Sequence, residues 1–324
     1  MIASALADNL LTAPVVAFVV ALVATLFKFD LRLPEAMYPI LSTFLLLAIG
    51  LKGGRSLAES PVEDLWKPLL GAVALGIITP IIAFLLFRAL GKVDITNSAA
   101  LAAHYGSVSA VTFTVVLTSL ETQEISYEGF MAGLLAVLEI VGIIVALFLA
   151  RKENSSAHWK EGLSEVIRGR SIAFLVAGML IGLIVGDERL LPTDGVFVQL
   201  FAGALALFLI EMGVLAAERL RDIRSAGFQV LLLGIAIPLI NGSLGALMGS
   251  VVGLSTGGIA ILATLAASAS YIAAPAAVRI ALPHASPGLY VTASLGITFP
   301  FNLVVGIPLY LSLIHISEPT RQAE

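Results

Sequence analysis

The strongest constraint on this sequence is a series of long apolar runs that recur along the whole chain. An apolar run of roughly 17 to 25 residues is long enough to cross a bilayer as an α-helix. The runs are continuously apolar instead of alternating in short segments, so they predict helices and not a β-barrel. About ten such runs are present, with approximate ends: Thr12 to Phe27, Met37 to Leu51, Leu69 to Leu90, Ser98 to Leu117, Gly129 to Ala150, Ser171 to Gly186, Val196 to Ala217, Phe228 to Val252, Gly258 to Leu282 and Gly288 to Tyr310.

The composition supports a membrane protein. Of the 324 residues, 59% are hydrophobic and only 12% are charged, whereas a soluble domain carries about 25% charged residues. The chain has no cysteine, which excludes disulfides, thiolate metal sites and covalent haem attachment. No basic region precedes the first run, so we do not expect Met1 to Asp8 to begin a cleaved signal peptide.

Lys and Arg are distributed unevenly between alternate loops. The lighter set is Lys52, Arg55, Lys67 and Arg189. The heavier set is Lys28, Arg32, Arg88, Lys92, Arg151, Lys152, Lys160, Arg168, Arg170, Arg219, Arg221, Arg224 and Arg279. The positive-inside rule places the heavier set in the cytoplasm, which predicts that both chain ends lie outside.

Matches between the two halves, at an offset of about 160 residues, predict an internal repeat. The matches occur in the same order in both halves and are Ala17 to Ala21 with Ala173 to Ala177, Leu33-Pro34 with Leu191-Pro192, Gly76 to Ile82 with Gly234 to Ile240, and Ser107 to Ser109 with Ser268 to Ser270. Each half holds about five spans, and an odd number inverts the second half relative to the first. The chain therefore divides into a first repeat (residues 1–150), a cytoplasmic linker (151–170), a second, inverted repeat (171–310) and a tail (311–324). Inverted repeats indicate a secondary transporter that works by alternating access.

The fourth span of each half combines small hydroxyl residues with a helix breaker near the middle of the membrane. These segments run from His104 to Ser109 and from Ser268 to Pro275. Interrupted helices at matched places in inverted repeats indicate a binding site, because the freed backbone groups need polar partners. Amides at a helix N-terminus attract anions, and carbonyls and hydroxyls suit Na⁺. Ordinary helix packing by small residues is the alternative.

Other polar residues lie within the predicted spans. Glu139 and Glu211 are costly in lipid, and each is either functional or a protonated carboxyl in a structural hydrogen bond. Thr298 and Asn302 either complete a cation shell or pack against the break at Pro300. We expect Asn241 to satisfy a carbonyl that Pro238 frees. A close helix contact is predicted at Gly245 and Gly249.

Enzyme activity is not expected. His104 and Ser107 are spaced like a base and a nucleophile on one helix face, but no orienting acid is evident. The sequence has neither a phosphate-binding loop nor a His-Glu-x-x-His motif. Nothing in it calls for a cofactor or a nucleic-acid partner. An ion channel stays open as an alternative, because pores also use broken helices.

Three segments resemble the sodium-dependent bicarbonate transporters known from cyanobacteria. They are Ala102 to Ser109, Ser270 to Ala277 and Gly296 to Asn302, and the resemblance extends from about Ala17 to Tyr310. It implies ten helices in two inverted five-helix repeats, with a gate domain and a moving core, commonly in a homotrimer. The implied activity is import of HCO₃⁻ with Na⁺ as coupling ion across the bacterial plasma membrane. The resemblance also implies a cytoplasmic PII-like regulator, although the linker here looks shorter than in the regulated members.

The resemblance assigns the candidate site to the two serine segments. The residues expected to bind substrate are Gly106, Ser107, Val108, Ser109, Ser268, Ala269, Ser270 and the adjacent Tyr271. The candidate Na⁺ ligands are Ser107, Ser109, Ser270, Glu139, Thr298 and Asn302. Another small anion could use the same chemistry. The tail from Leu311 to Glu324 resembles the translation of a sequencing adapter, so we expect His315 and Glu318 to have no function.

Overall fold

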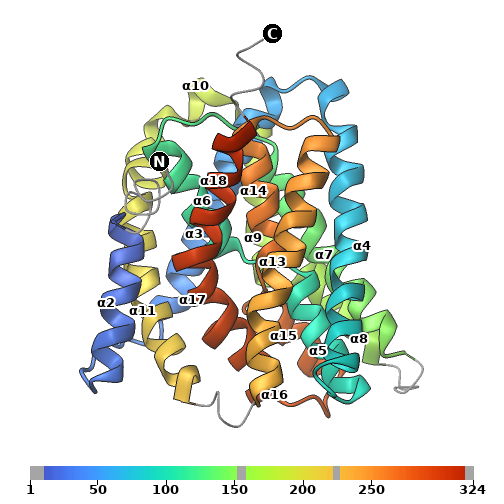
Figure 1. Ribbon diagram of the computed structural model, residues 1–324. Helices are drawn as coiled ribbons and strands as arrows, with labels where there is room; N and C mark the ends of the chain where they lie inside the picture. The colour runs from blue at the N-terminus through green and yellow to red at the C-terminus, as the bar shows by residue number, and fades with distance from the viewer. Residues whose placement is uncertain (1–10, 152–157, 222–226, 318–324) are drawn as a thin grey trace.

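The computed structural model is all-helical over the residues that it describes, which are 11–151, 158–221 and 227–317 (Figure 1). The helices that form its main body are α2 (Ala13–Leu26), α3 (Met37–Glu59), α4 (Trp66–Ala89), α5 (Ile95–Gly106), α6 (Ala110–Thr122), α7 (Met131–Leu149), α8 (His158–Arg168), α9 (Arg170–Val185), α11 (Phe201–Arg221), α13 (Phe228–Val251), α14 (Thr256–Ala267) and α15 (Ala273–Ala281). The last span is built from α16 (Pro287–Val291), the π-helix η4 (Thr292–Thr298), α17 (Phe299–Phe301), the π-helix η5 (Asn302–Gly306) and α18 (Ile307–Ser317). Short helices join α9 to α11, namely α10 (Asp187–Leu190), η2 (Leu191–Thr193) and η3 (Gly195–Gln199), and η1 (Val62–Asp64) precedes α4.

Length and hydropathy identify seven helices that could cross a membrane, counted over the described ranges. The number becomes eight if α8 and α9, which meet at a 40° bend, form one span. Two shorter apolar helices, α2 and α14, fall below the length of a full span. These helices confirm the predicted all-α membrane protein, whereas the predicted count of ten is not confirmed.

The helices pack as two bundles. One, which we call the four-helix bundle, is formed by α2, α3, α9 and α11, with α3 packed on α9 and α2 packed on α11. The other, which we call the crossed bundle, is formed by α4 to α7 and α13 to α18. The amphipathic linker helix α8 packs on α15 of the crossed bundle, although it runs directly into α9 of the four-helix bundle.

Glycines allow the tightest helix contacts. A Cβ atom added at Gly178 of α9 would lie 2.5 Å from the carbonyl oxygen of Leu47 in α3. In the crossed bundle, a Cβ atom at Gly245 would lie 2.7 Å from the carbonyl oxygen of Leu262, and one at Gly249 would lie 3.1 Å from the Cα atom of Ile259. The predicted close contact at Gly245 and Gly249 is therefore confirmed, and α14 is the helix that makes it.

Pro238 lies inside α13 and cannot donate to the carbonyl of Gly234, four residues earlier. The hydroxyl of Thr298 donates to this carbonyl oxygen at 2.7 Å. The expectation that Asn241 satisfies the freed carbonyl is therefore wrong. The partner comes from the last span, and no sequence pattern in α13 indicates it.

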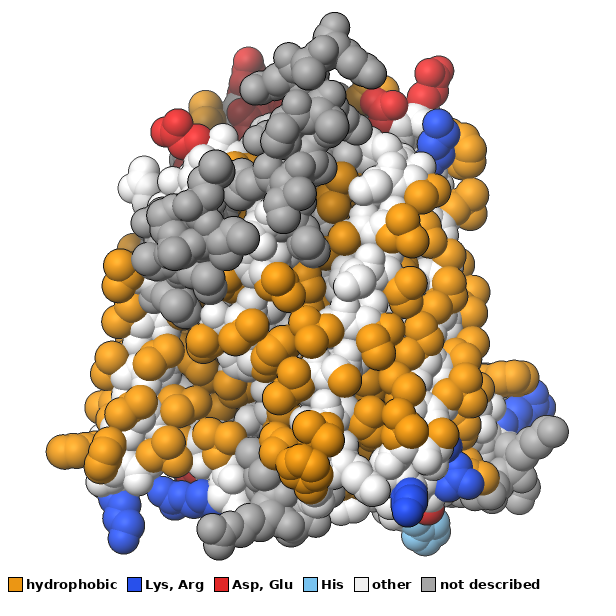
Figure 2. Space-filling view, in the orientation of Figure 1, with side chains coloured by type: hydrophobic (Ala, Val, Ile, Leu, Met, Phe, Trp, Pro, Cys, Tyr) orange, Lys and Arg blue, Asp and Glu red, His pale blue; other side chains and the backbone are white. Residues whose placement is uncertain are grey.

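Charged side chains separate toward the two ends of the molecule. Figure 2 shows Lys and Arg concentrated at one end, Asp and Glu at the other, and an apolar band between them. The helices run roughly along the axis that joins these ends (Figure 1). This arrangement agrees with the predicted sorting of basic residues, although Lys152 and Arg224 lie outside the described residues. We call the two ends the basic face and the acidic face.

Glu211 has a structural partner. Its Oε2 atom accepts a hydrogen bond from the backbone amide of Leu33 at 2.9 Å. Both residues belong to or adjoin the four-helix bundle, so this carboxyl ties the loop before α3 to α11. Of the two interpretations for Glu211, the structural hydrogen bond is the one that the contact supports.

The predicted tail begins inside α18. This helix continues from Ile307 to Ser317, and residues 318–324, which include Glu318, lie outside the described residues. Within the predicted linker, residues 152–157 also lie outside them.

Candidate substrate and ion site

Two helices of the crossed bundle are interrupted at the predicted serine segments. Helix α5 ends at Gly106 and α6 begins at Ala110. Helix α14 ends at Ala267 and α15 begins at Ala273. The serines of both breaks are at most 4% exposed. Both interruptions are therefore confirmed, and both lie in the protein interior, where backbone groups need protein partners.

The two breaks contact each other directly. The backbone amide of Ser270 donates to the carbonyl oxygen of His104 at 2.8 Å. The backbone amide of Ser109 donates to Oγ of Ser268 at 2.8 Å, and this hydroxyl in turn donates to the carbonyl oxygen of Leu265 at 2.7 Å. Segments separated by about 160 residues thus supply partners for each other's freed backbone groups.

Four helix ends meet at this crossing, and they offer two kinds of chemistry. The N-terminus of α6 is capped by Ser109, whose Oγ accepts from the backbone amide of Thr112 at 3.1 Å. The N-terminus of α15 has a similar contact, in which Oγ of Ser270 accepts from Ala274 at 3.2 Å. Helix N-termini favour anions. The C-termini of α5 and α14 place carbonyl oxygens at the same point, which suit a hard cation.

Helix α7 comes within backbone contact of the first break. A Cβ atom added at Gly142 would lie 1.8 Å from the carbonyl oxygen of Gly106. A Cβ atom at Gly106 would lie 2.4 Å from a ring carbon of Pro80 in α4. Only glycine fits at either position without a shift of the neighbouring backbone or ring. The end of α5 is therefore held between α4 and α7.

Glu139 lies one turn before Gly142 and faces the crossing. It is 3% exposed, and its Oε1 atom has no hydrogen-bond partner among the described residues. Together with Ser109, Ser270 and Tyr271 it lines a small cavity of about 10 Å³, roughly the space of one water molecule. The structure thus brings Glu139 and one serine of each break, Ser109 and Ser270, together around one cavity.

The remaining predicted ligands lie on the last span and have other contacts. Oγ1 of Thr298 donates to Gly234 and also meets the hydroxyl of Tyr105 at 2.7 Å. Nδ2 of Asn302 donates to the carbonyl oxygen of Ala267, the last residue of α14, at 2.9 Å. Oδ1 of Asn302 lacks a partner among the described residues. Asn302 therefore touches the second break, whereas Thr298 supports α13.

The pair of His104 and Ser107 does not form a base and nucleophile. Nδ1 of His104 lies 2.7 Å from the carbonyl oxygen of Ala100, and the imidazole packs against the ring of Tyr290 with centroids 4.5 Å apart. Oγ of Ser107 has no hydrogen-bond partner among the described residues. His104 contributes to the crossing through its backbone carbonyl.

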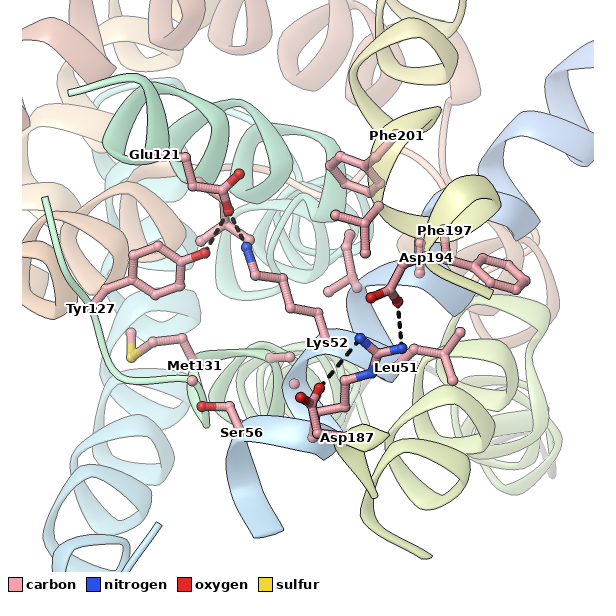
Figure 3. A pocket seen from close by; sticks show the side chains of 18 of the residues that line it. Leu51, Lys52, Ser56, Glu121, Tyr127, Met131, Asp187, Asp194, Phe197 and Phe201 are labelled. Carbon is pink, nitrogen blue, oxygen red and sulfur yellow. Dashed lines mark hydrogen bonds and ion pairs between the residues drawn. The ribbon is translucent and has the colours of Figure 1, made fainter. Parts of the chain in front are cut away.

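Sequence reasoning missed a second cavity, which opens between the two bundles on the acidic face (Figure 3). Its volume is about 500 Å³, and its lining includes Lys52, Arg55, Glu121 and Tyr127. The available signal was the small set of Lys and Arg residues assigned to this side of the membrane, to which Lys52 and Arg55 belong. Nothing in the local pattern predicts that Glu121 reaches Lys52.

The comparisons with known proteins agree with this arrangement. No curated protein matches the chain. A family profile described as the Na⁺-dependent bicarbonate transporter superfamily matches residues 13–315, which include both bundles and both breaks. On this match, the chain belongs to the Na⁺-dependent bicarbonate transporter superfamily.

Proposed function

We propose that this protein imports bicarbonate together with Na⁺, with both ions bound where the two broken helices cross. The observation that carries the proposal is the pair of hydrogen bonds that join the breaks, from Ser270 to His104 and from Ser109 to Ser268. They bring two helix N-termini and two helix C-termini to one buried point. A small monoanion and a monovalent cation can both be stabilised there without a buried Arg or Lys.

The packing of the helices supports two inverted repeats. In the first half the order is α2, α3, α4, the broken α5 and α6, and α7, and in the second half it is α9, α11, α13, the broken α14 and α15, and the last span. Equivalent pairs make equivalent contacts, because α3 packs on α9 as α11 packs on α2, and α4 packs on α5 as α13 packs on α14. Such pairs are what two related units produce around a pseudo-twofold axis.

We assign the four-helix bundle to the gate and the crossed bundle to the moving core. Both breaks belong to the crossed bundle, so one rigid unit would carry the bound ions past the other in an elevator-like movement. The small cavity at the crossing is closed on the gate side by Leu46 of α3 and Ser171 of α9. An ion at the crossing would therefore leave the membrane interior only after the two bundles shift.

The substrate-binding residues in this proposal are the two breaks, namely Gly106, Ser107, Val108, Ser109, Ser268, Ala269, Ser270 and Tyr271. The Na⁺ ligands are Ser107, Ser109, Ser270, Glu139 and Asn302, and Thr298 acts through its support of α13. The basic face is cytoplasmic in a bacterial plasma membrane, which places both chain ends outside. A homotrimer and a cytoplasmic PII-like regulator remain predictions from the family.

The experiment is uptake of labelled bicarbonate into proteoliposomes with and without an inward Na⁺ gradient. Ser107→Ala is the most informative variant. Oγ of Ser107 has no hydrogen-bond partner among the described residues, so the substitution breaks no hydrogen bond within the described protein. We expect Na⁺-dependent, saturable uptake in the wild type and a large loss in Ser107→Ala and Ser270→Ala. Ser250→Ala is the matched control, since Ser250 lies on the exposed face of α13 and bonds only its own helix.

Each contrary result has a definite meaning. Uptake that is absent under every gradient would reject bicarbonate and favour another small anion. Non-saturable flux without dependence on Na⁺ would favour a channel. Uptake by Ser107→Ala and Ser270→Ala at the level of Ser250→Ala would remove the serines from the site.

A further inference from the structure

The cavity on the acidic face lies between the gate and the core. Its walls come from α3, α10, η3 and α11 on one side, and from α6 and α7 on the other (Figure 3). Most of the lining is apolar or aromatic, and a small set of charged side chains projects into it. A volume of about 500 Å³ lies within the range of small-molecule sites, which is roughly 300 to 1,000 Å³.

This cavity leads toward the crossed breaks. Its floor includes Ile49 of α3 and Phe113 of α6. Three residues earlier in the same helices, Leu46 and Ala110 line the small cavity that Ser109 also lines. Three helical residues span about 4.5 Å along the axis, so one layer of side chains separates the two cavities.

The two cations in the cavity are held in different ways. Arg55 forms ion pairs with Asp194 at 2.6 Å and with Asp187 at 3.5 Å, and its side chain is only 15% exposed. Both carboxylates lie on the gate side, so this cluster is internal to the gate. Lys52 pairs with Glu121 of α6, and the side chains are 55% and 47% exposed. An ion pair this exposed is weak and can exchange partners.

Glu121 keeps a partner when Lys52 leaves. The hydroxyl of Tyr127 donates to the same carboxylate oxygen at 2.7 Å (Figure 3). Burial, the hydrogen bond to Glu121 and the negative charge of Glu121 all raise the pKa of Tyr127 above its ordinary value. The phenol is therefore protonated at physiological pH and remains a donor. Lys52 can leave without stranding a carboxylate.

We propose that this cavity is an outer capture site for a small monoanion, where Lys52 exchanges the carboxylate of Glu121 for the incoming anion. This inference rests on the proposed transport of bicarbonate. Arg55 is not the cation that binds the anion, because it is already paired with two carboxylates. Glu59, Asp187 and Asp194 also line the cavity, so Lys52, freed from Glu121, is the position where an anion can bind.

The exchange has a mechanical consequence. Lys52 belongs to the gate and Glu121 to the core, so their ion pair is a tie between the two units. An anion that takes Lys52 from Glu121 releases this tie, and arrival of the substrate then favours movement of the core. The other ion pairs described, from Arg32 to Glu218 and from Arg55 to its two carboxylates, lie within the gate and persist.

The absence of cysteine allows a direct test that does not require transport. Leu117→Cys places one thiol in the cavity wall on α6. Its reaction rate is measured with a negatively charged sulfonatoethyl methanethiosulfonate and with a positively charged trimethylammonium analogue. The two rates are then compared in Leu117→Cys and in its combination with Lys52→Gln. The matched control is Lys67→Gln, which removes the same charge from the same face but lies outside this cavity.

We expect Lys52→Gln to reduce the ratio of sulfonate to trimethylammonium rates by roughly three- to tenfold, because the local positive charge that attracts the anionic reagent is lost. Lys52→Arg should retain the wild-type ratio, and Lys67→Gln should not change it. Glu121→Gln tests the exchange in the opposite direction. It leaves Lys52 unpaired and should raise the sulfonate rate, which keeps the test decisive if Lys52→Gln fails to fold.

The proposal is overturned if Lys52→Gln and Glu121→Gln leave the ratio unchanged. Where bicarbonate uptake is observed, Lys52→Gln should raise the KM for bicarbonate. The control Lys67→Gln should leave this KM unchanged. A wild type that takes up no bicarbonate but shows the expected labelling ratios would reject the proposed substrate and retain the anion-capture site. Bicarbonate uptake by the wild type, together with an unchanged labelling ratio in Lys52→Gln, would reject the anion-capture site and retain the proposed substrate.

Discussion

The backbone amide of Ser270 donates a hydrogen bond to the carbonyl oxygen of His104 at 2.8 Å, and so joins two helix breaks that lie far apart in the sequence. A second bond, from the amide of Ser109 to Oγ of Ser268, completes the connection. The bonds differ in kind, since one acceptor is a main-chain carbonyl and the other is a side-chain hydroxyl. Only the second has a side-chain partner, so a conservative substitution can remove it without changing the backbone.

Ser268→Ala should therefore destabilise the crossing. It leaves the buried amide of Ser109 without its acceptor, and an unpaired buried donor costs about 1–3 kcal/mol. We expect a lower melting temperature in detergent and a loss of Na⁺-dependent uptake. Ser250→Ala, whose hydroxyl bonds only the carbonyl of Ala246 on the exposed face of α13, should behave like the wild type. Equal melting temperatures for the two variants would show that the bond to Ser268 does not hold the breaks together.

Gly142→Ala should be far more damaging than Gly133→Ala, although both lie in α7. A Cβ atom at Gly142 would lie 1.8 Å from the carbonyl oxygen of Gly106, whereas one at Gly133 would meet its nearest neighbour, the flexible end of Met179, at 3.4 Å. The first contact forces α7 away from the end of α5 at a cost of about 1–3 kcal/mol or more. Thermal unfolding in detergent and uptake measure the difference. A Gly142→Ala protein with wild-type stability and uptake would contradict the close approach.

The positions of the helix breaks could be predicted because they depend on local chemistry. Small hydroxyl residues beside a helix breaker occur at matched places in both halves, and the structure interrupts α5 and α14 there. The all-helical membrane fold follows from the apolar runs in the same way. These features depend on neighbours in the sequence and need no knowledge of packing.

Side-chain partners across the fold could not be predicted. The carbonyl that Pro238 frees was expected to find Asn241, three residues along the same helix, but Thr298 of the last span reaches it instead. The outer cavity depends in the same way on α3 lying beside α6, which brings Lys52 to Glu121. Such pairs are set by helix packing, which a hydrophobic pattern constrains only in part.

Thr298→Val should destabilise the core while Thr298→Ser should largely preserve it. The hydroxyl of Thr298 donates to Gly234 and contacts the hydroxyl of Tyr105, so Val leaves the buried carbonyl of Gly234 unpaired, at about 1–3 kcal/mol. The hydroxyl of Tyr105 keeps its bond to the carbonyl oxygen of Ala293. Ser retains the hydroxyl and loses only a methyl group. Melting temperatures in detergent give the order. If Val lowers the apparent Na⁺ affinity and leaves stability unchanged, Thr298 is a direct ligand and not a support for α13.

The N-terminus of α5 gives a prediction for pH. Asp94 caps this helix outside the membrane-spanning segment, and its carboxylate accepts from the backbone amide of Asn97 at 3.0 Å and from Nδ2 of Asn97 at 2.6 Å. Burial acts to raise the pKa of Asp94, but the hydrogen bonds from Asn97 and from nearby backbone amides outweigh it and lower the pKa below 3.8.

A carboxyl whose pKa is lower in the folded state stabilises the fold above its unfolded pKa, and this contribution is lost as the pH falls through the folded value. Asp94→Asn keeps a capping side chain but removes the charge. We expect the wild type to melt above Asp94→Asn at pH 7, and the difference to shrink as the pH falls below 3.8. Melting temperatures of the two proteins in one detergent, measured from pH 7 downward, provide the comparison. A difference that stays constant over this range, or grows toward low pH, would mean that the charge of Asp94 does not stabilise the start of α5.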